Sequence, residues 1–226
     1  MKIVHVTLRF DAPGGVETNV RELARRLHAG GDEVEVFASD LYDEAGWDRR
    51  SNYRPVVDGV PVRRFAVRKK LVPNLTLPLM VGLIDALADS GADVIHAHSH
   101  RYGHVLQAAA VCRRRGIPLV ISTSYHPADR RETRLTRHIL RADDHAFGMT
   151  AYRVARAIVV QSELEASLLR EFAPADRLRI LPPGVDLDEW RDPTADRLDG
   201  TALPSDYFLF AGRVAANNCS NPSITK

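Results

Sequence analysis

The chain has 226 residues, of which 45% are apolar and 27% are charged, and its formal net charge is only +2. These values are ordinary for a globular domain, and the near-neutral balance argues against a nucleic-acid partner. No apolar run is long enough to span a bilayer, which argues against an integral membrane protein.

The two cysteines, Cys112 and Cys219, are too few for a disulfide framework and are typical of a reducing compartment. Cys112 lies in an Ala-rich stretch with helical character, so we expect it to be buried. The sequence runs from Met1 directly into an apolar strand, without the pattern of a signal peptide. We therefore expect a cytoplasmic protein, with any membrane association peripheral and on the inner face.

The start of the chain has the pattern of a βαβ unit. A β-branched run over residues 2–7 predicts a buried strand, and a loop with Pro13-Gly14-Gly15 at its tip follows. Helical spacing comes next, at Val16, Val20, Leu23 and Leu27, and Gly30-Gly31 marks the end of this helix. Alternation over residues 33–38 predicts a second strand, whereas residues 40–58 are expected to form a loop.

Strands and helices continue to alternate along the rest of the chain. Further strands are predicted at residues 60–67, 94–96, 119–122, 158–160, 178–181 and 207–211. Helices are predicted at residues 79–87, 103–115, over most of 132–156, and after Ser162, which forms a capping box with Glu165. This alternation predicts an α/β fold with a doubly wound, mostly parallel, Rossmann-like sheet and helices on both faces. Such sheets bind ligands beyond the carboxyl ends of their strands, so the candidate site loops are residues 8–17, 96–104, 122–130 and 182–186.

The turn Gly14-Gly15-Val16-Glu17 joins the first strand to the first helix. Glycines let a ligand approach the backbone closely, and the free N–H groups of a helix N-terminus attract an anion. The same residues could instead form a plain turn that needs glycine for its geometry. The spacing G-x-G-x-x-G is absent, which argues against an NAD-dependent enzyme.

Three histidines follow the strand at residues 94–96, in the run His96-Ala97-His98-Ser99-His100. Alternation points His96 and His98 the same way, so the two rings could share a metal ion or hydrogen-bond a polar ligand such as a sugar. Histidines of a surface loop are the third interpretation. Because the sequence offers no evident carboxylate or cysteine partner, we assign no metal site.

The stretch Ser122-Thr123-Ser124-Tyr125-His126-Pro127 ends another strand. Hydroxyl groups, an aromatic ring and an imidazole that titrates near neutral pH suit the recognition of a polar substrate. An ordinary turn set by Pro127 explains the same pattern, and the local sequence does not decide between the two.

Two stretches are strongly basic. One contains Arg63, Arg64, Arg68, Lys69 and Lys70. The other contains ten arginines between residues 113 and 156 against Asp129, Glu132, Asp143 and Asp144. A solvated face is the simplest interpretation, and an anionic membrane surface or a phosphorylated acceptor is the sharper one.

Taken together, these pieces resemble glycosyltransferase family 4, the retaining nucleotide-sugar enzymes of GT-B fold. Six landmarks occur in the family's order over residues 1 to about 213. They are Gly14-Gly15-Val16-Glu17, Asp93-Val94-Ile95-His96-Ala97-His98, Thr123 to His126, Val159-Val160-Gln161-Ser162, Leu181-Pro182-Pro183-Gly184-Val185-Asp186, and Phe208-Leu209-Phe210-Ala211-Gly212-Arg213.

The resemblance implies two facing Rossmann-like domains and transfer of a sugar from a nucleotide-diphosphate sugar to an acceptor hydroxyl, with no protein nucleophile and no cofactor. It places Gly14, Gly15 and Arg213 at the donor and His126, the catalytic candidate, near the transferred sugar. Glu17, His96, His98 and Tyr125 are the candidate acceptor-binding residues.

Residues 1–185 are expected to form the acceptor-binding domain, 186–206 a linker, and 207–226 the first strand of a second domain with an irregular tail. The family's lysine and donor-binding glutamates have no counterpart after Arg213. We therefore expect this chain to be inactive alone, and its open cleft face could be covered by a second copy. The alternatives are a GT-B nucleotide-sugar epimerase or phosphorylase, and a non-catalytic module that binds an acceptor or a lipid phosphate.

Overall fold

The computed structural model describes residues 1–43, 48–67, 78–127, 133–185 and 187. The chain divides into two compact units, Met1–Gly184 and Val185–Lys226. Nearly all of the second unit, including the predicted strand at residues 207–211 and Arg213, lies outside the described residues. The description below therefore concerns the first unit.

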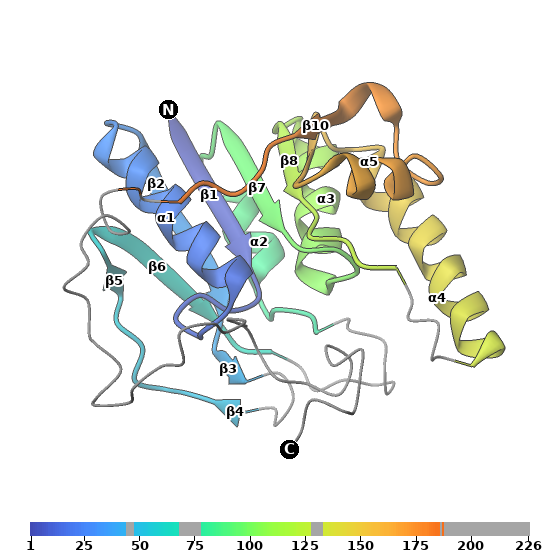
Figure 1. Ribbon diagram of the computed structural model, residues 1–226. Helices are drawn as coiled ribbons and strands as arrows, with labels where there is room; N and C mark the ends of the chain where they lie inside the picture. Colours follow the sequence, from blue (N-terminus) through green and yellow to red (C-terminus); the bar gives the residue numbers. More distant parts are fainter. Residues whose placement is uncertain (44–47, 68–77, 128–132, 186, 188–226) are drawn as a thin grey trace, which may run out of the picture. The chain divides into compact units, whose positions relative to one another are not determined.

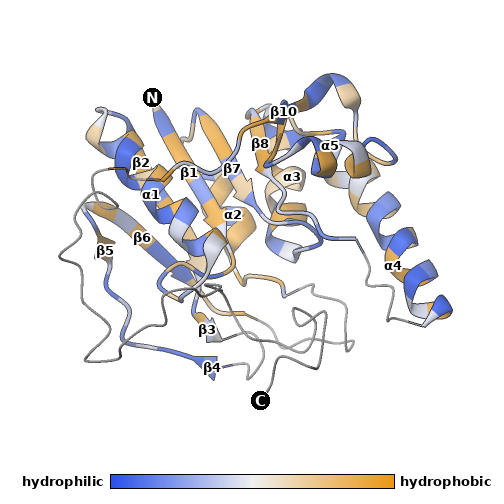
Figure 2. Ribbon diagram, in the orientation of Figure 1, coloured by the Kyte–Doolittle hydropathy of each residue, from blue (hydrophilic) through white to orange (hydrophobic). Residues whose placement is uncertain are grey.

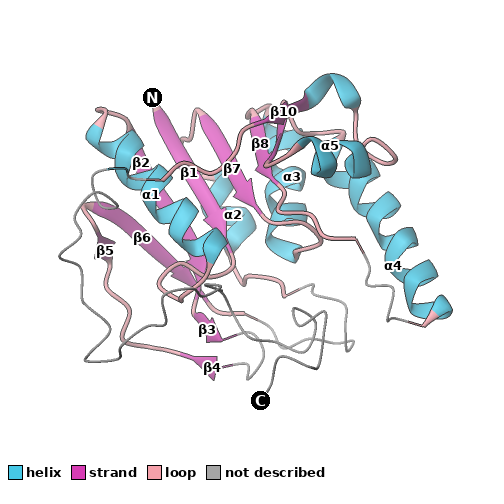
Figure 3. Cartoon of the chain, in the orientation of Figure 1, coloured by secondary structure: helices cyan, strands magenta, loops and turns pink. Residues whose placement is uncertain are grey.

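The first unit alternates strands and helices (Figure 3). The strands are β1 (Lys2–Thr7), β2 (Glu33–Ser39), β3 (Leu41–Asp43), β4 (Asp48–Arg49), β5 (Val56–Val57), β6 (Val60–Phe65), β7 (Val94–His98), β8 (Leu119–Ser122), β9 (Ala157–Val160) and β10 (Leu178–Ile180). The helices are α1 (Gly15–Ala29), α2 (Leu83–Ala88), α3 (Gly103–Arg115), α4 (Arg134–Phe147) and α5 (Glu163–Leu169), with a π-helical turn at Gly148–Tyr152 and a 3-10 turn at Ala175–Arg177.

The strands form one eight-stranded sheet in the order β10-β9-β8-β7-β1-β2-β6-β5. All its neighbours are parallel except β5, which pairs antiparallel with β6. The chain builds outward from β1 through β2 to β6, then returns to the other side of β1 and builds outward again from β7. The predicted doubly wound, mostly parallel α/β fold is confirmed, and β1 and β7 form its topological switch point.

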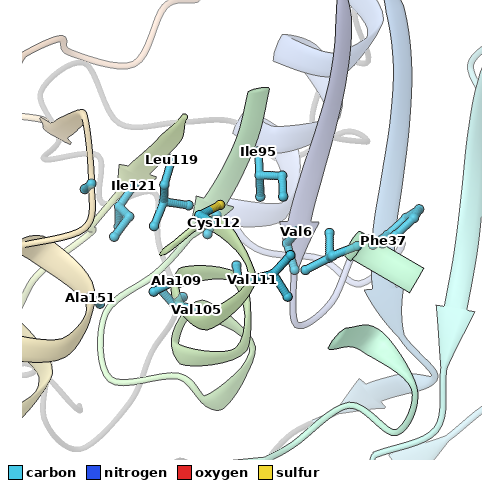
Figure 4. Close-up of a cluster of buried hydrophobic side chains, with 14 of the residues drawn as sticks. Val6, Phe37, Ile95, Val105, Ala109, Val111, Cys112, Leu119, Ile121 and Ala151 are labelled. Carbon is cyan, nitrogen blue, oxygen red and sulfur yellow. The ribbon is translucent and has the colours of Figure 1, made fainter. Parts of the chain in front are cut away.

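Helices cover both faces of the sheet, with α1 on one side and α2 and α3 on the other (Figure 1). On the α2–α3 side, alternate residues of β1, β7 and β8 pack against α3. Figure 4 shows Val6, Ile95 and Leu119 of these strands beside Val105 and Ala109 of α3. Cys112 belongs to this core as expected, and burial raises the pKa of its thiol to about 12.

The second core lies under α1, where Val20 and Ala24 pack against Val34 and Val36 of β2. The central strands are apolar along most of their length, whereas α1 and α4 carry hydrophilic residues on much of their surface (Figure 2). This pattern fits a parallel sheet that is buried between two helical layers.

Three details differ from the sequence-based predictions. The expected loop at residues 40–58 contains the short strands β3, β4 and β5. Strand β7 extends to His98, two residues further than predicted, because it pairs with both β1 and β8. The helix predicted at 79–87 begins only at Leu83, after Gly82 with φ of 77°. Leu79, which precedes the helix, and Ile84, within it, are exposed and not part of a buried helix face as predicted.

Candidate functional site

The polar loops that the sequence singles out meet at the carboxyl edge of the sheet. Strand β1 leads into the glycine turn, β7 into residues 99–102, and β8 into residues 123–127. Three non-glycine residues of these loops have positive φ, namely Ser99 at 85°, Arg101 at 59° and Ser124 at 47°. Such conformations are costly and concentrate at functional sites, so their clustering here supports a binding site at the switch point.

The glycine turn is filled by the side chain of Glu17. This carboxylate is buried and forms an ion pair with Arg9, whose Nη2 lies 2.6 Å from Oε1. A Cβ atom at Gly14 would collide with the Glu17 carboxylate, whereas a Cβ at Gly15 would meet nothing within 4 Å. The Glu17 carboxylate therefore occupies the place where a Cβ at position 14 would lie, whereas the φ of 166° at Gly14 is ordinary extended backbone that any residue can adopt.

His96 and His98 lie close to a third histidine that the sequence analysis did not select. His5 of β1 is the register partner of His96 in β7. Its Nδ1 lies 3.0 Å from Nε2 of His98, and the rings of His96 and His98 are 4.1 Å apart between centroids. Burial lowers the pKa of His5 to about 4 and the pKa values of His96 and His98 well below the usual range, so the three rings are neutral at pH 7.

The third histidine of the run, His100, belongs to a separate buried network. Its Nε2 lies 2.7 Å from Asp144 of α4, and its Nδ1 lies 2.6 Å from the Tyr152 hydroxyl. Arg101 donates two hydrogen bonds to Asp144, and the Tyr125 hydroxyl donates another at 3.1 Å. Burial alone would raise the pKa of Asp144, but the hydrogen bonds from His100 and Arg101 outweigh it and lower this pKa. The network therefore ties the loops after β7 and β8 to α4.

Glu165, at the start of α5, holds the loop after β8 from the other side. Its carboxylate accepts hydrogen bonds from the Tyr125 N–H at 2.7 Å, from the Thr123 hydroxyl and from the Gln161 N–H at 2.7 Å. The predicted capping box is therefore only half present. The Ser162 hydroxyl accepts from the Glu165 N–H as expected, but the Glu165 carboxylate bonds to the loop and to Gln161.

The predicted site residues thus fall into groups with different exposure. His126 is exposed at the carboxyl edge, and His96 is half-buried with its Nε2 at 2.8 Å from the Ser122 hydroxyl. Glu17, His98 and Tyr125 are buried. Gly14 and Gly15 start α1, and Arg213 lies outside the described residues.

Sequence reasoning missed four residues that build this edge, namely His5, Arg9, Asp144 and Glu165 in its role as a loop anchor. A polar residue within an apolar strand was the available signal for His5. In the sequence analysis, Asp144 is treated only as a charge opposing neighbouring arginines, because its partners His100 and Arg101 lie more than 40 residues earlier in the chain. No local pattern identifies such a residue as buried.

A basic hollow of about 510 Å³ lies at the same edge, beyond β2 and β6. Its lining includes Arg50, Arg54, Arg63 and Arg64. Arg64 is ion-paired with Asp11 and largely buried, so the prediction of a solvated face is wrong for this arginine. Arg54 and Arg63 are exposed.

The exposed face of α4 combines basic and apolar side chains. Arg134, Arg137, His138 and Arg141 line a shallow hollow on it. Leu135 is 70% exposed and Ile139 is 49% exposed. Among the described residues, no helix has the length and apolar character that crossing a membrane requires.

The model of the family described as Glycosyltransferase Family 4 matches residues 13–189 of the chain. The GDP-mannose:cellobiosyl-diphosphopolyprenol alpha-mannosyltransferase of Xanthomonas oryzae is 28% identical over 230 residues, which cover 96% of this chain and 53% of that protein. The D-inositol 3-phosphate glycosyltransferase of Xylanimonas cellulosilytica is 29% identical over 225 residues, which cover 89% of this chain and 52% of that protein. The chain thus spans about half the length of the curated relatives it matches.

Among solved structures, that of Anabaena HepE in complex with UDP and glucose aligns with a TM-score of 0.57 at 15% identity. The alignment covers 83% of this chain and 46% of that one. At this level of identity the likeness concerns the fold alone.

Proposed function

The chain belongs to glycosyltransferase family 4, and we propose that it forms the acceptor-side domain of a retaining enzyme that moves a sugar from a nucleotide-diphosphate sugar to an acceptor hydroxyl. The observation that carries this proposal is the meeting of the family's loop landmarks at the switch point, where Ser99, Arg101 and Ser124 have positive φ. A sheet edge of this kind is where doubly wound folds bind their ligands.

Within this proposal, His126 hydrogen-bonds the reacting sugar, because it is exposed at the end of the loop that Glu165 and Asp144 anchor. The backbone at Gly14 and Gly15, together with Arg213, faces the diphosphate. Preorganised donors of this kind stabilise charge that develops in the transition state. Glu17, His96, His98 and Tyr125 build the acceptor side, and only His96 of these four is open to solvent.

We further propose that residues 1–185 form the acceptor domain, that 186–206 are a linker, and that 207–226 begin a second domain. The compact unit Met1–Gly184 supports the first of these boundaries. We also propose that two copies of the chain can form a homodimer in which each covers the carboxyl edge of the other's sheet, where the site loops lie.

The basic hollow beyond β2 and β6 favours an acceptor that carries phosphate. Arg54 and Arg63 are exposed in its lining, and arginine binds phosphate oxygens through paired hydrogen bonds. Two relatives are also named for compounds that carry diphosphate or phosphate, cellobiosyl-diphosphopolyprenol and D-inositol 3-phosphate. The exposed face of α4 supports a peripheral position on the inner face of a membrane, in a cytoplasmic protein of cell-envelope or glycolipid synthesis.

The test is a product assay on the whole protein encoded by the source gene, incubated with UDP-, GDP- and ADP-sugars and with phosphorylated hydroxyl acceptors. We expect a new glycoside that retains the anomeric configuration of the donor. An altered nucleotide sugar formed without acceptor would indicate an epimerase. Sugar 1-phosphate formed from a glycan and inorganic phosphate, supplied in a parallel reaction without nucleotide sugar, would indicate a phosphorylase. Acceptor binding without any turnover would indicate the non-catalytic module.

A further inference from the structure

His5, His96 and His98 bring three imidazoles together on the α1 face of the sheet. The register pairs His5 with Val36 of the core under α1 and with His96 of β7, so these side chains point to the same face. His98 lies two residues after His96 and therefore shares this face. One ring nitrogen from each histidine can be chosen so that all three lie within 4.8 Å of one another.

This spacing is close to that of three ligands of one ion. Zinc binds histidine nitrogen at about 2.0–2.1 Å in tetrahedral geometry, which places two ligand nitrogens about 3.3 Å apart. Nδ1 of His5 and Nε2 of His98 are already 3.0 Å apart. The other separations between the chosen nitrogens are at most 4.8 Å, so rotation of the rings would have to shorten those that exceed the spacing zinc requires.

His96 has the kind of partner that metal-binding histidines commonly have. One of its nitrogens, Nε2, is 2.8 Å from the Ser122 hydroxyl of β8. In the tautomer that donates from Nε2 to this hydroxyl, Nδ1 keeps the lone pair that a metal ion requires. His96 is half-buried, whereas His5 and His98 are fully buried.

We propose that His5, His96 and His98 form a binding site for one divalent transition-metal ion, with Zn²⁺ as the best match. Imidazole ligands suit zinc, copper, nickel and iron, whereas magnesium and calcium prefer oxygen. Three protein ligands leave a fourth position for water. The ion would cross-link β1 to β7 at the switch point, and this role does not depend on the proposed sugar transfer.

The experiment uses the 226-residue chain purified without a histidine tag and stripped with EDTA. Titration with Co²⁺ should give one bound ion per chain and the visible absorption of a tetrahedral nitrogen and oxygen site, and Zn²⁺ should displace it. X-ray absorption of the zinc form should show three imidazoles at about 2.0–2.1 Å. A folded protein that binds no stoichiometric ion, or a zinc shell with fewer than three imidazoles, would overturn the proposal.

Variants identify the ligands. His5→Gln and His96→Gln should each weaken Zn²⁺ binding at least tenfold, whereas His28→Gln, at an exposed histidine of α1, should leave it unchanged. Ser122→Ala keeps all three ligands and should weaken binding about 10- to 100-fold without changing the stoichiometry. Circular dichroism establishes that each variant is folded. If His5→Gln does not fold, the Zn²⁺ affinity of His96→Gln, at a half-buried position, tests the proposal in its place. Unchanged Zn²⁺ affinity in a folded variant of any of the three histidines would contradict the proposed site.

Discussion

At the scale of single residues, the interior of this domain holds an unusual set of neutral histidines. His104 is one of them, fully buried in α3 with its Nε2 at 2.8 Å from the backbone oxygen of His98. Burial lowers the pKa of His104 to about 4, although the hydrogen bond to His98 acts in the opposite direction. Because the folded pKa is depressed, the unfolded chain binds the proton first as the pH falls.

This depression predicts a pH-dependent stability. Between the ordinary pKa of 6.5 and about 4, the unfolded state binds more protons, so stability falls as the pH is lowered through this window. The depression of the His104 pKa corresponds to a loss of about 3 kcal/mol in the free energy of unfolding between pH 7 and pH 4. Urea unfolding across this range, in EDTA to remove metal ions, measures it.

The matched variant is His104→Gln, which keeps a donor near the position of Nε2 and does not titrate. Its stability should fall less steeply with pH than that of the wild type. The exposed His28→Gln should follow the wild-type curve. Identical pH profiles for the wild type and His104→Gln would contradict the assignment of a depressed pKa to His104.

His126 is the residue on which the proposed chemistry depends most directly. In the whole enzyme, His126→Ala should lower the rate of transfer at least tenfold, equivalent to about 1.4 kcal/mol in the barrier. The unfolding midpoint should remain unchanged, because the side chain is exposed and contributes nothing to the core. Wild-type turnover by the purified variant would remove His126 from the site.

At the scale of elements, α5 has a function beyond covering the sheet, because its first turn positions the loop after β8. Removing the Glu165 carboxylate leaves the buried Tyr125 N–H without its acceptor, whereas the Thr123 hydroxyl can still donate to the Val159 carbonyl at 3.3 Å. A buried unsatisfied group costs about 1–3 kcal/mol, so Glu165→Ala should destabilise the domain by about this amount.

Chemical unfolding of Glu165→Ala measures this loss. Glu163→Ala is the control, because Glu163 lies in the same first turn but is exposed. It removes only the favourable effect of an acidic residue at a helix N-terminus, about 0.3–1 kcal/mol. If the two variants lose equal stability, the hydrogen bonds from the loop to Glu165 are not what stabilises this region.

Helix α4 predicts a surface property. Leu135 and Ile139 are exposed among Arg134, Arg137 and His138, and each basic residue near an anionic bilayer contributes about 1 kcal/mol. The chain should sediment with phosphatidylglycerol vesicles but not with phosphatidylcholine vesicles, and less so as salt screens the attraction. Arg141 contributes less, because it is ion-paired with Glu171 at 2.7 Å.

The double variant Leu135→Gln and Ile139→Gln should lose most of this binding. Leu164→Gln, at an equally exposed leucine of α5, should retain it. Equal binding to both lipids, or none at low salt, would leave α4 as an ordinary solvated face.

Helices and strands with a regular repeat of apolar residues could be predicted from the sequence. Elements whose position depends on pairing with residues far away in the chain could not. The bounds of β1, α3 and β8 match the predictions because each is a regular apolar run between clear turn signals. The hairpin of β5 and β6 was missed although Asp58-Gly59 is a typical two-residue turn, with φ of 51° and 82°. Strand β5, with two residues, is too short to show alternation, whereas β6 lies within the strand predicted at residues 60–67.

The position of the candidate site at the carboxyl edge of the sheet could be predicted from the sequence. The side-chain contacts that build it could not. The loops at the carboxyl edge follow from strand order, which the alternation of strands and helices implies. The burial of Glu17 and His98 does not follow, because it depends on Arg9 and on His5, the latter in a strand 93 residues before His98. Charge and motif patterns along the chain contain no information on such pairings.

At the scale of the whole molecule, the described unit offers little to a nucleotide. Beside the glycine turn, the feature that attracts an anion is the N-terminus of α1, which contributes about 0.3–1 kcal/mol toward an exposed anion. The exposed Arg54 and Arg63 belong to the hollow beyond β2 and β6. Glu17 already places a carboxylate against that turn. Micromolar affinity requires a binding free energy of roughly 8 kcal/mol, far more than a helix N-terminus contributes.

The 226-residue chain should therefore show no low-micromolar binding of UDP-, GDP- or ADP-sugars by titration calorimetry, and no turnover. Binding of one of them in the low-micromolar range would place the donor site in this half of the fold. Sedimentation equilibrium on the same sample measures whether the chain is a monomer or the proposed dimer.

The reversal of strand order at β1 has a consequence for folding during synthesis. Strand β1 pairs on one side with β2, which follows closely in the chain, and on the other side with β7, whose residues are made only after position 93. Until then, a growing chain would carry β1 as an unpaired edge, the kind of edge that promotes association with other chains. Closing it requires a long-range pairing, which is slow compared with local contacts. The loops of the site come together only in that step, so a nascent chain would complete its βαβ opening well before it could bind a ligand.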